Sequence, residues 1–137
     1  MSVDVGRNQL RASFTTHRDA SQALEEGAST ALLLFYSVEC GLKAVLLDRH
    51  GWRSTSQLPK HLKSHNLDGL AKELLLPLPL CDRMAYCASR KDPGEQVAFG
   101  ELHQAWRYGR ALEKKGEEKA LAVLRELLSW CQRELRV

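Results

Sequence analysis

Two residues of opposite charge, Glu39 and Lys43, lie four positions apart in the most apolar stretch of the 137-residue chain. On a helix, this spacing and order place a carboxylate beside an ammonium group, so we expect an ion pair. Because either charge buried alone would be strongly unfavourable, the pair predicts a fixed polar network or a contact with a partner, such as the seam of a dimer. The alternative is that both residues lie on a narrow solvated stripe.

A second group of chemically capable residues lies at 103–110. His103 and Arg107 would share a helix face, which combines a proton-transfer group with a cation that binds phosphate. Tyr108 and Trp106 could stack on nucleobases, and Arg110 continues the basic side. This segment is the candidate surface for RNA or a nucleotide. In the structural alternative, Trp106 belongs to the core and Arg107 forms an ordinary ion pair.

Metal chemistry has weaker support in the sequence. His61 and His65 have the spacing of two ligands on a helix, but no third ligand is adjacent, and His65 is better explained as a capping or packing residue. Cys81 and Cys87 could join them only in an unspecific pattern. We therefore expect no metal and no cofactor.

Composition and charge describe an ordinary globular domain. The net charge is +3, and the basic residues are scattered, so charge alone does not predict binding to nucleic acid. The four cysteines have no CxxC spacing, which favours reduced thiols and a cytoplasmic location. A third functional possibility, nucleotide binding, depends on basic residues along the segment 49–63: Arg49, Arg53, Lys60 and Lys63.

Helical periodicity dominates the chain and predicts a single all-α domain over residues 1–137, an up-and-down bundle of five or six helices. The segment 29–49 is apolar nearly all round, so we expect it at the centre of the bundle, and Glu39 and Lys43 argue against a membrane span there. A long loop is expected at 50–64. The other helices are expected at 8–26, 65–75, 80–88, 99–109 and from 116 to the end, with no strands.

Three segments together resemble the HEPN domains (higher eukaryotes and prokaryotes nucleotide-binding): 36–46, which carries Glu39 and Lys43, then 65–70, which begins with His65, then Arg107 and Tyr108. In that family, a central helix carries a glutamate followed four residues later by lysine and alanine. A histidine then begins the third helix, and an arginine and tyrosine precede the last one. The resemblance implies a helical bundle that usually dimerises and occurs in bacterial toxin–antitoxin and antiphage systems.

Many HEPN proteins are metal-independent ribonucleases, whose site is an arginine followed four to six residues later by a histidine at a dimer cleft. The chain departs from that pattern, because no histidine follows Arg107 or Arg110. His103 and Arg107 offer both chemical types in the reverse order. The family's catalysis is therefore not carried over to this chain.

The sequence thus leads to two expectations. The first is a non-catalytic, HEPN-like binding or scaffolding subunit that forms a homodimer and engages a partner protein encoded nearby, RNA or a nucleotide. Its candidate binding residues are Glu39, Lys43, Arg107, Tyr108 and Arg110. The alternative is an endoribonuclease that uses His103 as base and Arg107 as phosphate ligand at a dimer cleft.

Overall fold

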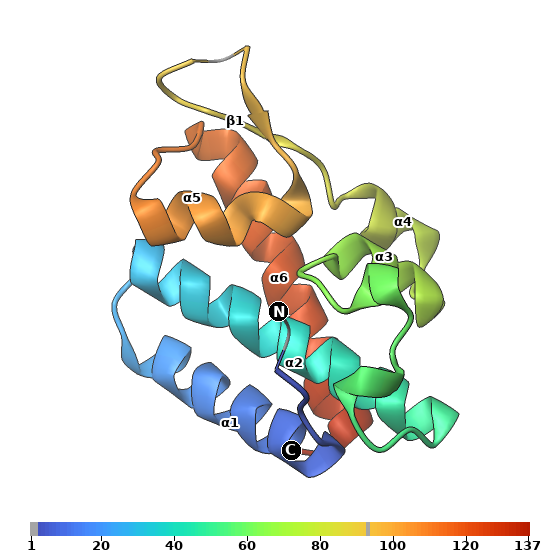
Figure 1. Ribbon diagram of the computed structural model, residues 1–137. Helices are drawn as coiled ribbons and strands as arrows, with labels where there is room; N and C mark the ends of the chain where they lie inside the picture. The colour runs from blue at the N-terminus through green and yellow to red at the C-terminus, as the bar shows by residue number, and fades with distance from the viewer. Residues whose placement is uncertain (1–2, 93) are drawn as a thin grey trace.

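The computed structural model describes residues 3–92 and 94–137, and this part of the chain is an all-α bundle of six α-helices with a small hairpin (Figure 1). The expected fold class is therefore confirmed, at the upper end of the expected number of helices. The helices are α1 (Arg7–Ala23), α2 (Ala28–His50), α3 (Leu67–Glu73), α4 (Leu78–Asp82), α5 (Leu102–Tyr108) and α6 (Lys114–Leu135). The strands β1 (Cys87–Ala88) and β2 (Gln96–Val97) form the hairpin, and 3-10 turns occur at Thr55–Gln57, Lys60–Leu62 and Phe99–Glu101.

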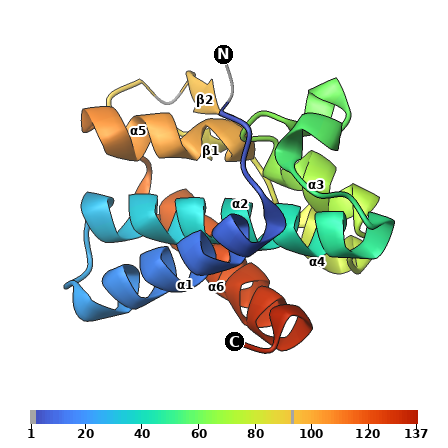
Figure 2. The same cartoon turned by 60° about the horizontal axis from the view of Figure 1, so that its bottom comes forward.

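Helix α2 is the central element, as its apolar periphery predicts. It packs against α1, α3, α5 and α6, and Figures 1 and 2 show it between α1 and α5 with α6 crossing behind. By length and mean hydropathy (1.6) α2 could cross a membrane, but 67% of that stretch is buried inside the bundle. Such burial is what the core helix of a bundle shows, so the hydropathy of α2 is weak evidence for a span.

Gly41 allows α2 to approach both of its long neighbours. A Cβ atom at this position would lie 2.7 Å from Cys131 Sγ in α6 and 2.7 Å from Phe14 Cδ1 in α1. Both of those side chains are fully buried, so neither can swing into solvent. A residue with no side chain is therefore required where the three helices meet.

We expect Gly41→Ala to lower the free energy of unfolding by about 1–3 kcal/mol, because the overlap outweighs the roughly 1 kcal/mol that alanine gains in a helix interior. Urea unfolding of the two proteins measures the difference. Gly116→Ala in α6 is the matched control, since its nearest contact would be 3.4 Å from the flexible Glu113 carboxylate. If both substitutions change the free energy of unfolding equally, the close contacts at Gly41 are not the cause of the loss.

The structure corrects the prediction for residues 80–88. Helix α4 begins earlier, at Leu78, and ends at Asp82, whereas Cys87 and Ala88 form a strand opposite Val97 and Gln96. Pro79 is accommodated because the first turn of a helix needs no backbone N–H donor there. Strands of two residues are too short to show alternation in the sequence, so the hairpin could not be recognised.

The expected loop at 50–64 is folded into two 3-10 turns and is tied to the N-terminal segment. Thr55 N donates to the Val5 carbonyl at 2.9 Å, and Val5 N donates to Thr55 Oγ1 at 2.9 Å. The isolated bridge between Gly6 and Ser54 continues this pairing. The N-terminal residues therefore hold this connection against the bundle.

Smaller boundary corrections follow from capping. The first helix ends at Ala23, and the last begins at Lys114 because the Glu113 side chain accepts from Gly116 N at 2.8 Å. The third helix begins at Leu67, where the side chain of the N-cap Asn66 accepts from Gly69 N at 3.1 Å. His65 therefore precedes this helix and is free to reach toward α2.

Candidate functional site

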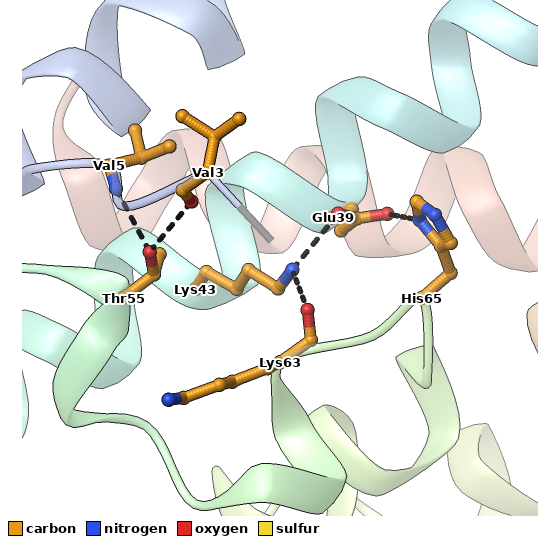
Figure 3. A network of polar contacts seen from close by, with 7 residues as sticks. All are labelled: Val3, Val5, Glu39, Lys43, Thr55, Lys63 and His65. Carbon is orange, nitrogen blue, oxygen red and sulfur yellow. Dashed lines mark hydrogen bonds and ion pairs between the residues drawn. The ribbon is translucent and has the colours of Figure 1, made fainter. Parts of the chain in front are cut away.

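Glu39 and Lys43 form the expected ion pair on the face of α2 that meets the 60–65 connection. Lys43 Nζ donates to Glu39 Oε2 at 3.0 Å and to the Lys63 carbonyl at 3.2 Å (Figure 3). Lys43 is only 7% exposed, so the solvated-stripe alternative is wrong. The charges are matched within the chain, by a carboxylate and a backbone carbonyl.

His65 completes this network from a segment far away in the sequence. Its Nδ1 contacts Glu39 Oε1, while 44% of its side chain remains exposed (Figure 3). The hydrogen bond to Glu39 raises the pKa of His65. Burial opposes ionisation of Glu39, but the hydrogen bond from His65 and the charge of Lys43 together lower the pKa of that carboxyl. The pair therefore presents a half-exposed imidazole oriented by an ionised carboxylate.

The 3-10 turn before α5 approaches His65 closely. A Cβ at Gly100 would lie 2.9 Å from the His65 carbonyl oxygen, so this position also needs glycine. Through this contact, the backbone of the turn lies directly against the residue that carries the exposed imidazole.

His103 lies behind His65, with a ring centroid separation of 4.1 Å, and it also packs on Phe35 at 5.0 Å. It is only 2% exposed, and its Nδ1 has no hydrogen-bond partner among the described residues. Burial, and next the charge of His65, lower the pKa of His103. The two histidines therefore have opposite properties: His65 favours the cation and His103 the neutral ring.

Arg107 reaches the same cluster from the end of α5. Its Nη2 donates to the Tyr36 hydroxyl, and its Cζ lies 5.6 Å from the centre of the Tyr36 ring. The Tyr36 ring is in turn 6.3 Å from the ring of His65 and 6.3 Å from that of His17 in α1. A guanidinium, a phenol and imidazoles thus adjoin the Glu39 network.

Glu39, Lys43 and His65 line an open groove of about 590 Å³. Residues 3–5 and α1 provide the opposite wall, together with the 3-10 turn that begins at Thr55. We call this hollow the network groove. Its polar base consists of an ion pair and an imidazole, which suits the recognition of a polar or charged ligand.

Tyr108 and Arg110, predicted to act with Arg107, lie elsewhere. Tyr108 is 76% exposed, and Arg110 forms an ion pair with Glu95 of the hairpin connection. Both line a separate hollow of about 440 Å³ between β2 and α5. Trp106 belongs to the core, as the alternative interpretation has it, since it is buried and its Nε1 donates to Glu117 at 3.0 Å.

The basic residues proposed for nucleotide binding are not gathered. Arg49 donates to the Leu74 carbonyl at 2.9 Å and lies 5.5 Å from the Trp130 ring, whereas Lys63 borders the network groove. Within the described residues, no group of three or more His, Cys, Asp or Glu side chains could hold a metal ion. All four cysteines are free, and burial raises the pKa of the half-buried Cys40 to about 11.

Sequence reasoning missed the contact between Glu39 and His65. His65 is not the cap, because Asn66 is, but it does pack, with its ring 4.1 Å from that of His103, and it also contacts the carboxylate. The signal available was the order of segments in the family resemblance, which contains both residues. Periodicity could not show that they meet.

Comparisons of the chain with models of known families, with curated proteins and with solved structures find no match.

Proposed function

We propose that this protein is a HEPN-like binding or scaffolding subunit of a bacterial antiphage or toxin–antitoxin system. The observation that supports this most is the convergence of the three segments that carry the resemblance. Lys43 and Glu39 in α2 bind each other, His65 contacts Glu39, and Arg107 binds Tyr36, whose ring lies 6.3 Å from that of His65. Residues separated by more than sixty positions are thus neighbours in one cluster.

A role without catalysis fits the residues at 103–107. The imidazole of His103 is enclosed by Phe35 and His65, so a ligand as large as RNA does not reach it without rearrangement of these rings. Arg107 is exposed but engaged by Tyr36. In this proposal the protein is cytoplasmic, carries no cofactor, forms a homodimer and engages a partner encoded nearby or RNA.

The proposal is tested by solution mass and binding. We expect sedimentation to show a concentration-dependent species of twice the 15.5 kDa chain mass, or labelled hairpin or single-stranded RNA to be bound. Arg107→Glu should weaken that association by about tenfold, because it reverses an exposed charge in the cluster. Arg90→Glu, the same change at an exposed position outside the cluster, should not. A strict monomer that binds neither RNA would contradict the proposal.

One observation favours a second candidate, a metal-independent endoribonuclease. His65 is exposed, its pKa is raised by the hydrogen bond to Glu39, and Arg107 lies beside it across Tyr36. In this candidate, the neutral imidazole takes the proton of an RNA 2′-hydroxyl while the 2′-oxygen attacks the adjacent phosphorus, and the arginine stabilises the phosphorane. The bond from phosphorus to the 5′-oxygen then breaks, the 5′-oxygen takes a proton from the imidazolium or from water, and a 2′,3′-cyclic phosphate remains. In this candidate, the base is His65 instead of the enclosed His103.

Incubation of hairpin and single-stranded RNA with the purified protein in EDTA separates the two candidates. If the nuclease candidate holds, His65→Ala abolishes cleavage, whereas His61→Ala, at an exposed histidine four residues earlier, retains it. Absence of cleavage by the wild type removes the enzyme and leaves the binding subunit.

A further inference from the structure

A strongly apolar run, residues 74–80, extends from the end of α3 into the first turn of α4 and exposes two of its leucines. Leu75 is 87% exposed and Leu78 is 73% exposed. Leu75 also has a φ of 58°, in the left-handed region that a residue with a Cβ rarely adopts. This conformation ends α3 in a Schellman turn, in which Leu75 N donates to the Lys72 carbonyl and Leu76 N donates to the Ala71 carbonyl, each at 3.0 Å. The turn leaves the Leu75 side chain in solvent, where it adds nothing to the core.

A groove of about 610 Å³ lies next to this run, between α4 and α6. Its apolar lining is formed by Pro77, Pro79, Leu80 and Trp130. Leu78 lies between the two lining prolines in the sequence, and Leu75 lies two residues before Pro77. Exposed leucines beside an apolar groove on a small protein favour an interaction site.

The rim of the groove is basic. Three arginines and one glutamate line it, Arg83, Arg125, Arg133 and Glu126, which leaves an excess of two positive charges. Arg83 contacts Glu126 at 2.6 Å, and Arg125 lies 3.8 Å from the almost fully exposed Glu26. Arg133 forms no ion pair within the described part of the chain.

We propose that this surface, the leucine–arginine groove, docks an acidic amphipathic helix of a partner protein. The apolar face of that helix covers Leu75, Leu78 and Trp130, and its carboxylates meet the arginines of the rim. A second copy of this chain fits less well, because two arginine-rimmed faces would repel each other. The leucine–arginine groove shares no residue with the network groove, and the inference does not depend on the family resemblance.

The probes are two labelled synthetic helical peptides about five turns long. They share one leucine face at i, i+3, i+4 and i+7, and they carry either glutamates or lysines on the other faces. Fluorescence anisotropy with the full chain is expected to show saturable binding of the acidic peptide, about tenfold tighter than that of the basic one. Equal binding of the two peptides, or no saturable binding of either, would overturn the proposal.

Variants that preserve the fold locate the site. Leu75→Gly removes the side chain and suits the left-handed backbone, so the Tm should not fall, while the acidic peptide should bind about tenfold more weakly. Arg133→Glu should weaken binding of the acidic peptide and strengthen that of the basic one, whereas Arg90→Glu should change neither. Unchanged binding by both groove variants would place the peptide elsewhere and refute the assignment.

Sedimentation tests the other possible occupant of the leucine–arginine groove, a second copy of this chain. If wild type dimerises and Leu75→Gly is monomeric, a second copy covers the groove and the acidic partner is excluded. A dimer is also expected from the proposed function, and the two sites are told apart by the variant that dissociates it: Arg107→Glu for the cluster at Glu39 and Leu75→Gly for the leucine–arginine groove.

Discussion

Glu39→Gln is expected to lower the free energy of unfolding by about 3 kcal/mol, because it leaves the Lys43 ammonium buried without a counter-charge. The remaining acceptors would be a neutral amide and the Lys63 carbonyl, which accepts at 3.2 Å. Half-exposed surface pairs contribute far less, since water replaces the lost partner. Urea unfolding at neutral pH measures the difference from the wild type.

A double-mutant cycle attributes this effect to the pair. Lys43→Met should also destabilise, but by less, because the Glu39 carboxylate keeps its hydrogen bond with His65. The double variant Glu39→Gln/Lys43→Met removes both charges and should be less destabilised than the sum of the two single changes. Additive effects would mean that the two side chains are independent, contrary to their 3.0 Å contact.

The second large effect is a pH dependence of the free energy of unfolding, to which His65 and His103 contribute in opposite directions. The pKa of His65 is raised above 6.5, so its stabilising contribution is complete below that pH and is lost as the pH rises through the raised value. The pKa of His103 is lowered below 6.5, so stability is lost as the pH falls from there through the lowered value. Glu39, Lys43 and Glu101 are the other charged groups that act on His65.

Two variants separate the contributions of His65 and His103 to this pH dependence, measured by urea unfolding between about pH 5 and about pH 9. His65→Gln should destabilise most on the acid side, and its effect should decrease as the pH rises through the raised pKa of His65. His103→Phe removes the unpartnered Nδ1 and the penalty for protonation, so it should lessen the acid-side loss. If His65→Gln has the same effect at every pH, the contact with Glu39 does not favour the protonated ring.

The contrast between the two histidines matters for either proposed role. His103 is enclosed and disfavours a charge, while His65 is half exposed and favours one. A ligand or RNA phosphate that approaches the cluster therefore meets the half-exposed His65, whose pKa is raised, and the guanidinium of Arg107. The sequence suggested His103 as the candidate base, whereas in the structure His103 is enclosed and His65 is the exposed imidazole.

Local pattern was sufficient to predict the fold class, the central helix and the ion pair. Helical periodicity is a property of neighbouring residues, and an apolar periphery requires that 29–49 be covered on all sides. Glu39 and Lys43 lie one turn apart on a single helix, so their contact is also local. The Asn66 cap is equally local, since its partner Gly69 is three residues away.

Only the tertiary structure decided which distant side chains meet. Glu39 and His65 belong to separate segments whose relative placement depends on the packing of the 60–65 connection against α2. Arg107 and Tyr108 are adjacent in the sequence, yet successive side chains on a helix point in different directions, so one joins Tyr36 and the other lines the hollow beside β2. Periodicity determines which face of each helix is apolar, but the packing of the whole core determines which faces meet.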